Sequence, residues 1–121
     1  MRTSFSSPRT HLAAALAAAL VLALAPAATA ADSRACDPIV NPYEGTRYEG
    51  TDIRKIRAVA VSCSTARSVA RGAHRKALGM TPPPSGVRRF EWKGWKVTGD
   101  LRDDVDRYVA GRGGKRVRWV F

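Results

Sequence analysis

An uncharged apolar run near the N-terminus limits how much of this 121-residue chain is left to fold. Two arginines precede the run, which extends over Leu12–Ala25 and is interrupted by Pro26. Small residues follow at positions 28–30, as in the cleavage region of a secretory signal peptide. We therefore expect residues 1–30 to be a signal peptide cut near Ala30, and the exported chain to be a single small domain.

A retained N-terminal membrane anchor is the minor alternative for the same segment. The uncharged stretch from Leu12 to Ala31 has 20 residues, which is long enough to span a bilayer. However, Pro26 interrupts it, most of its residues are alanines, and no basic cluster follows it directly. These features favour a cleaved leader and a secreted or extracytoplasmic protein.

The two cysteines of the chain, Cys36 and Cys63, both follow the expected leader. An even number of cysteines in an exported protein favours a disulfide. The competing interpretation is a reactive thiol, because Cys63 follows Ser62 at the expected start of a helix, where a cysteine pKa falls. His74 is the one histidine after the leader and lies about three helical turns away, too far to act as its base. We expect a disulfide between the cysteines and a surface position for His74.

Charge divides the exported chain into two parts. Residues 32–52 contain two basic and five acidic residues and carry a charge of −3, whereas residues 53–121 contain 17 basic and five acidic residues and carry +12. Proline-containing turn signals and the twice-occurring tetrapeptide YEGT predict an acidic, irregular arm over residues 31–52. This arm could lie across the basic remainder of the chain, residues 53–121, which we expect to form the folded domain.

The pattern of residues 53–121 predicts an α+β fold in which one helix packs on a small antiparallel sheet of about four strands. Residues 56–61 alternate as in a strand. Ser62 fits the N-cap of a helix that runs from Cys63 to about Leu78, and Gly79 fits its C-terminal cap.

The C-terminal half of the domain is rich in aromatic residues and predicts further strands. Residues 87–97 favour one bent strand, with a tight turn at Lys93-Gly94 as the alternative. Residues 108–121 predict a closing hairpin. In its last strand Val117, Trp119 and Phe121 should point one way, whereas Arg116 and Arg118 should point the other way.

The block Ile56–Ala70, with its V-S-C-x-x-A-R motif, and the C-terminal segment G-K-x-V-x-W-V-F resemble a group of small, mostly uncharacterised secreted proteins of high-GC bacteria. Those proteins end in G-K-x-V-x-F and carry two later cysteines where this chain has Val97 and Val109. The resemblance implies a structural role for the cysteines. It also implies that Val97 and Val109 face each other on adjacent strands, and it carries over no catalytic residue.

Candidate catalytic and metal-binding residues are few. Four aspartates cluster at positions 100, 103, 104 and 106, but arginines interleave with them, and we interpret them as solvated turn acids. One histidine and two widely spaced cysteines do not form a zinc pattern, so we expect no metal and no cofactor.

Basic residues interleaved with aromatic residues suggest binding of a polyanion, because a net positive charge attracts polyanions and anionic membranes without specificity. No specific recognition of nucleic acid is expected, since an exported protein meets little of it. The leading hypothesis is a non-enzymatic binding module for an anionic cell-envelope polymer or lipid, and the alternative is a small secreted enzyme or enzyme inhibitor. The candidate polyanion-binding residues are Arg67, Arg71, Arg75, Lys76, Arg88, Arg89, Lys93 and Lys96.

Overall fold

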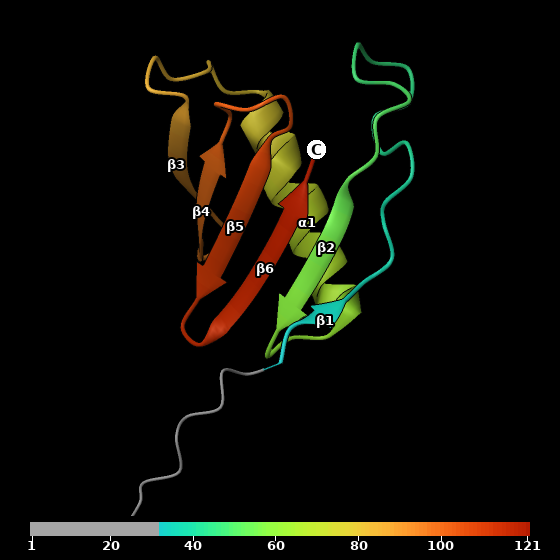
Figure 1. Cartoon of the computed structure of the whole chain (residues 1–121), viewed down its shortest axis with the longest axis vertical. Coiled ribbons are helices and arrows are strands. Elements are labelled where there is room, and N and C mark those ends of the chain that lie inside the picture. The colour runs from blue at the N-terminus through green and yellow to red at the C-terminus, as the bar shows by residue number, and fades with distance from the viewer. Residues whose placement is uncertain (1–31) are drawn as a thin grey trace, which may run out of the picture.

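The computed structural model describes residues 32–121, so the expected signal peptide and its membrane-anchor alternative lie outside the described residues. Six strands pair antiparallel in one sheet of order β1-β2-β6-β5-β4-β3, and the helix α1 lies against one face of it (Figure 1). The elements are β1 (Arg34–Ala35), β2 (Arg54–Val59), α1 (Cys63–Leu78), β3 (Val87–Trp92), β4 (Trp95–Asp100), β5 (Arg107–Arg112) and β6 (Lys115–Val120).

The α+β class with one helix is therefore confirmed, but the expected number of strands is too low. The arm contributes β1, which pairs with the outer edge of β2. In addition, the segment expected to be one bent strand forms two strands, β3 and β4. Within residues 32–121, no helix is both long enough and apolar enough to cross a membrane.

The turn between β3 and β4 is a two-residue loop. Trp92 pairs with Trp95, and the residues between them, Lys93 (φ 45°) and Gly94 (φ 80°), both have positive φ. Positive φ at both loop residues gives a twist that matches that of a β-hairpin. The prediction of a bent strand is wrong, because the change of phase at Lys93-Gly94 reflects a reversal of the chain.

The helix has the bounds and the start that the sequence predicts. The side chain of Ser62 accepts a hydrogen bond from the Thr65 N–H, which satisfies a free donor of the first turn. At the other end, the Gly79 N–H donates to the carbonyl oxygen of Lys76 at 3.1 Å. The small residues on one side of the helix are buried and allow it to lie close to the sheet. They are Ala66, Ala70, Ala73 and Ala77.

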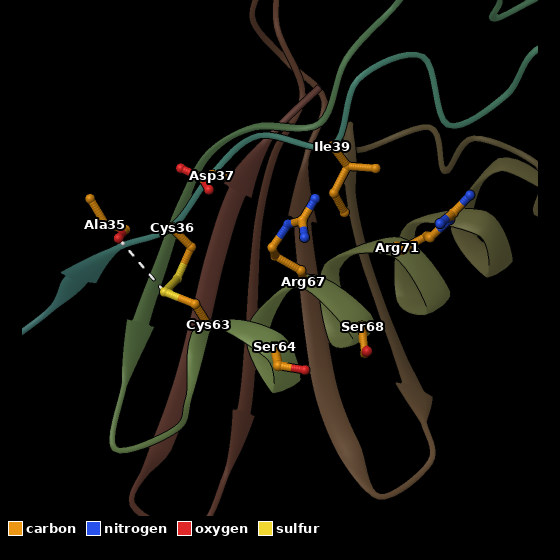
Figure 2. Close-up of a pocket in the computed structure, with 9 residues that line it drawn as sticks. All are labelled: Ala35, Cys36, Asp37, Ile39, Cys63, Ser64, Arg67, Ser68 and Arg71. Atoms are coloured by element: carbon orange, nitrogen blue, oxygen red, sulfur yellow. Dashed lines mark hydrogen bonds between the residues drawn. A yellow bond between two sulfur atoms is a disulfide. The ribbon is translucent and has the colours of Figure 1, made fainter.

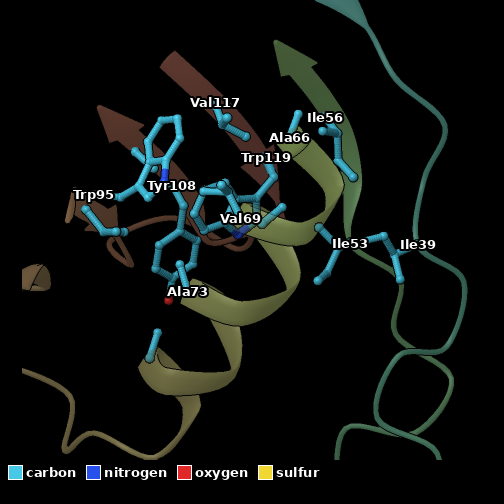
Figure 3. Packing of buried hydrophobic residues seen from close by; sticks show 14 of the residues in the cluster. Ile39, Ile53, Ile56, Ala66, Val69, Ala73, Trp95, Tyr108, Val117 and Trp119 are labelled. Carbon is cyan, nitrogen blue, oxygen red and sulfur yellow. The ribbon is translucent and has the colours of Figure 1, made fainter. Parts of the chain in front are cut away.

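The sheet buries the alternate residues that face the helix. In β6, Val117 and Trp119 are buried whereas Arg116 and Arg118 are exposed, so the predicted orientation of this strand is confirmed. Trp119 stacks on Tyr108 of the neighbouring strand β5, with ring centroids 5.2 Å apart and an interplanar angle of 6° (Figure 3). These large rings fill the space between the sheet and the small side chains of the helix.

Val97 and Val109 lie on the adjacent strands β4 and β5, but they do not face each other. Val97 pairs with Ala110, and Val109 pairs with Thr98, so the two valines are one residue out of register. Because successive side chains of a strand point to opposite faces, Val97 is buried and Val109 is exposed. The prediction that these two valines face each other in the core is therefore wrong.

The acidic arm is fastened to the domain at several points. β1 pairs with β2, and Cys36 and Cys63 form the predicted disulfide, which joins the arm to the start of α1. Ile39 and Ile53 then exchange two backbone hydrogen bonds of 2.9 and 3.0 Å. The disulfide excludes Cys63 as a free nucleophile and is typical of an oxidising, extracytoplasmic compartment.

His74 is buried, so its expected surface position is wrong. Its Nδ1 atom lies 2.7 Å from the hydroxyl oxygen of Tyr43 in the arm, and its side chain is 0% exposed. The ring of Phe121 lies beside it at 4.1 Å between centroids, and that of Tyr108 contacts it edge-on. The histidine thus links the arm, the helix and the end of the chain within the core.

Candidate polyanion-binding surface

The face of the sheet opposite α1, here called the open face, consists of the outward residues of β2–β6. The strand register aligns these residues in rows across five strands. The central row contains Arg57, Arg118, Val109, Thr98 and Arg89. The next row contains Val59, Arg116, Gly111, Lys96 and Glu91.

The alternation of the strands creates this basic surface. Arg116 and Arg118 alternate with Val117 and Trp119, so burial of the apolar pair turns both guanidinium groups outward. The same alternation turns Lys96 outward, because its neighbour Val97 is buried. The open face is therefore positively charged because the opposite positions form the core.

Few carboxylates neutralise the open face. Within residues 32–121, ion pairs join Arg102 to Asp100 and Arg107 to Asp103, and no other ion pair is present. Hydrogen bonds from Arg102 lower the pKa of Asp100 to about 2. Both ion pairs agree with the interpretation of the clustered aspartates as turn acids beside arginines. In the central row and the next row of the open face, no cation forms an ion pair within this part of the chain. The cations of these two rows are Arg57, Arg89, Lys96, Arg116 and Arg118.

The structure does not bring the eight predicted polyanion-binding residues together on one surface. Arg89 and Lys96 lie on the open face, whereas Arg67, Arg71 and Arg75 form an exposed row along α1, here called the helix ridge. Lys76 donates to the Glu91 carbonyl oxygen at 2.6 Å, and the Nζ atom of Lys93 lies 5.0 Å from the centre of the Trp92 ring. These two lysines lie near the edge of the sheet.

Arg88, the eighth predicted residue, is only 6% exposed and is therefore not available to an external polyanion. Its Nη1 atom donates to the carbonyl oxygen of Ala77 in the last turn of α1. The negative end of the helix dipole lies at this turn, so a buried cation is favourable there. Arg88 thus has a structural role, although its neighbour Arg89 is on the open face.

A groove of about 500 Å³ lies between the arm and the first turns of α1 (Figure 2). The Cys36–Cys63 disulfide lines it, together with Asp37 and two arginines of the helix ridge. One of these, Arg67, already donates to the Pro38 carbonyl oxygen at 3.4 Å, and Asp37 supplies a negative charge close by. The groove is therefore less favourable for a polyanion than the open face.

Three arginines in the central row and the next row of the open face were absent from the predicted set, namely Arg57, Arg116 and Arg118. The sequence contains the signal that could have identified two of them, because Arg116 and Arg118 alternate with core residues in the last strand. What it lacks is the register that places Arg57 of β2 directly beside Arg118 of β6.

Comparisons with known proteins gave no match: no family model fits the sequence, and no curated protein or solved structure is significantly similar to it. The chain is therefore described by its own features, an α+β domain with one disulfide and a basic open sheet face.

Proposed function

We propose that this protein is an exported, non-enzymatic binding module whose open face binds an anionic cell-envelope polymer. One observation carries the proposal: exposed cations that have no ion-pair partner among residues 32–121 lie on neighbouring strands of a single sheet face. The expected signal peptide and the disulfide support a location outside the cytoplasm, where such polymers occur.

The open face also suits an extended ligand better than a small one. The register places Arg118 between Arg57 on one side and Val109 on the other, and neighbouring strands lie about 4.8 Å apart. A polymer with regularly repeated charges can contact several strands at once, and each arginine can donate two parallel hydrogen bonds to a phosphate or carboxylate. Many weak contacts of this kind give salt-dependent binding.

The test compares two pairs of substitutions that remove the same charge from different surfaces. Arg116→Gln with Arg118→Gln removes two charges from the open face, and Arg71→Gln with Arg75→Gln removes two from the helix ridge. Binding of poly(glycerol phosphate) is measured over a range of salt concentrations. The open-face double variant should bind more weakly, and its log–log salt slope should fall by roughly 1.5, because each lost phosphate contact contributes about 0.7–0.9.

The helix-ridge double variant should keep nearly all of the binding. If both double variants lose affinity equally, the attraction depends on net charge alone and the open face is not the site. If the wild-type protein binds no polyanion, or binds phosphatidylglycerol vesicles but not the polymer, the proposal is wrong.

A further inference from the structure

The centre of the open face is uncharged. Val109 and Gly111 of β5 and Thr98 of β4 are neighbours there, and Val109 is 36% exposed. We call these three residues the seat. A β-carbon on Gly111 would come no closer than 3.9 Å to the backbone of Lys115, and apart from its chain neighbours no side chain of residues 32–121 lies nearer to that position. The seat is therefore a low, smooth strip of small side chains.

Cations border the seat on both sides. Arg116 and Arg118 of β6 pair directly with Gly111 and Val109. On the other side Lys96 pairs with Gly111, and Arg89 lies beyond Thr98. Because neighbouring strands are about 4.8 Å apart, the backbones of β6 and β4 are roughly 10 Å apart. This width admits one extended chain between the cations of β6 and Lys96 of β4. Arg89 lies one strand further out on β3, next to Glu91, which is the one acidic side chain of the two rows.

The open face carries no aromatic side chain among the described residues. Trp95 and Trp119 are buried on the helix side of the sheet, and the ring of Trp92 packs against Gly72 of α1. Proteins that bind single-stranded nucleic acid stack the bases on aromatic rings. The flat faces of sugar rings also pack best on aromatic surfaces. The seat provides neither, so it favours a thin chain without rings.

We infer that the seat binds a single chain of a phosphodiester-linked polyol, with its uncharged carbons over Val109 and Gly111 and its phosphates contacting the cations on either side. Four of the five cations in the central row and the next row are arginines, whose planar guanidinium groups match phosphate with paired hydrogen bonds. The Thr98 hydroxyl can donate to a phosphate or a polyol oxygen. This inference rests on the proposed function and specifies its ligand class.

Filling the seat without changing the charge tests the inference. Val109→Trp places a large ring on the strip, and Val40→Trp is the matched control, because Val40 is 71% exposed in the arm and lies outside the open face. Affinities are measured for poly(glycerol phosphate), polygalacturonate and oligo(dT) at equal charge concentration, and for phosphatidylglycerol vesicles. Folding of each variant is checked by its unfolding midpoint.

The wild-type protein should bind poly(glycerol phosphate) more tightly than the other three probes. Val109→Trp should weaken that binding roughly tenfold, which is the effect of losing about one charged hydrogen bond. Its binding of oligo(dT) should be equal or stronger, because the substitution adds a ring on which bases can stack. Val40→Trp should change none of these affinities.

The outcomes separate this inference from the proposed function. If Arg116→Gln with Arg118→Gln weakens poly(glycerol phosphate) binding but Val109→Trp does not, the open face binds polyanions and the seat inference is overturned. Equal affinity for polygalacturonate, or a preference for the vesicles, overturns it as well. If no open-face variant loses binding to any of the probes, the proposed function itself is refuted.

Discussion

Acid should destabilise this protein through the protonation of His74. The imidazole is buried among Tyr43 of the arm, Tyr108 of β5 and Phe121, and the cation of Arg88 on β3 lies close enough to oppose a second positive charge. Burial, and to a smaller extent Arg88, lower the pKa of His74 from 6.5 to about 4. A protonated imidazole in this place would lack solvent, and no carboxylate of residues 32–121 forms an ion pair with it.

The size and sign of the effect follow from proton linkage. In the unfolded chain the imidazole regains its ordinary pKa of about 6.5, so the unfolded state binds the proton more tightly than the folded state. The free energy of unfolding should therefore be greatest above pH 6.5 and fall as the pH is lowered from about 6.5 to about 4. The total loss should be about 3 kcal/mol, since one pKa unit corresponds to about 1.4 kcal/mol.

Other shifted groups do not produce this slope. Burial raises the pKa of Asp106, so this carboxyl binds its proton more tightly in the folded state and favours folding at acidic pH, the opposite sign. Arg102 lowers the pKa of Asp100 from 3.8 to about 2, so the contribution of this carboxyl is lost as the pH falls from about 3.8 to about 2, below the range in which His74 acts. Tyr43 and Tyr108 have pKa values raised by burial to about 12 and stay neutral throughout.

Urea unfolding followed by tryptophan fluorescence between pH 4 and 8 measures the effect. His74→Phe keeps a planar ring in the core and should abolish the slope, although it should cost about 1 kcal/mol at neutral pH because the Tyr43 hydroxyl loses its partner. Tyr43→Phe removes the same hydrogen bond but keeps the histidine, so its slope should persist. An equal slope in His74→Phe, or a folded-state His74 that titrates near 6.5, would refute the reasoning.

Two further predictions concern the covalent and steric constraints on α1. Replacing Cys36 and Cys63 together by alanine should lower the free energy of unfolding by about 3.5 kcal/mol, because the 27-residue separation is no longer closed in the unfolded chain, and urea unfolding measures this. Gly72→Ala should destabilise the wild-type protein despite alanine's better helix propensity of about 1 kcal/mol, since its β-carbon would overlap the ring of Trp92. In a Trp92→Ala background the same change should stabilise, and a loss of stability there would show that the ring is not the cause.

The helix and the disulfide could be predicted from the sequence because their signals are simple. Ser62 and Gly79 mark the two ends of α1, and a chain with two cysteines allows one intramolecular pairing. The β3–β4 turn was harder to predict, since Lys93 adopts a positive φ that lysine rarely favours. There the requirement to pair Trp92 with Trp95 overrides the preference of the single residue.

His74 and Arg88 show why residue type alone predicted an exposed position for two side chains that are buried. His74 follows Ala70 by four residues and precedes Ala77 by three, so the helical spacing already placed it on the buried face. Its polarity suggested the surface, and Tyr43, the hydrogen-bond partner of its Nδ1 atom, lies 31 residues away in the arm. Arg88 depends equally on tertiary structure, because its acceptor is the carbonyl of Ala77 at the end of α1.

The basic open face has an energetic cost to the free protein that an anionic chain would remove. Arg57 and Arg118 are direct cross-strand partners, and like charges in that relation destabilise a sheet, whereas favourable pairs contribute about 0.2–1 kcal/mol each. Arg57 offsets part of this cost by donating to the Ser33 hydroxyl at 2.8 and 2.9 Å, but Arg116 and Arg118 have no comparable side-chain contact within residues 32–121. A phosphate between neighbouring guanidinium groups would convert their repulsion into attraction. The repulsion stored in the free sheet therefore adds to the driving force for binding a polymer that carries repeated negative charges.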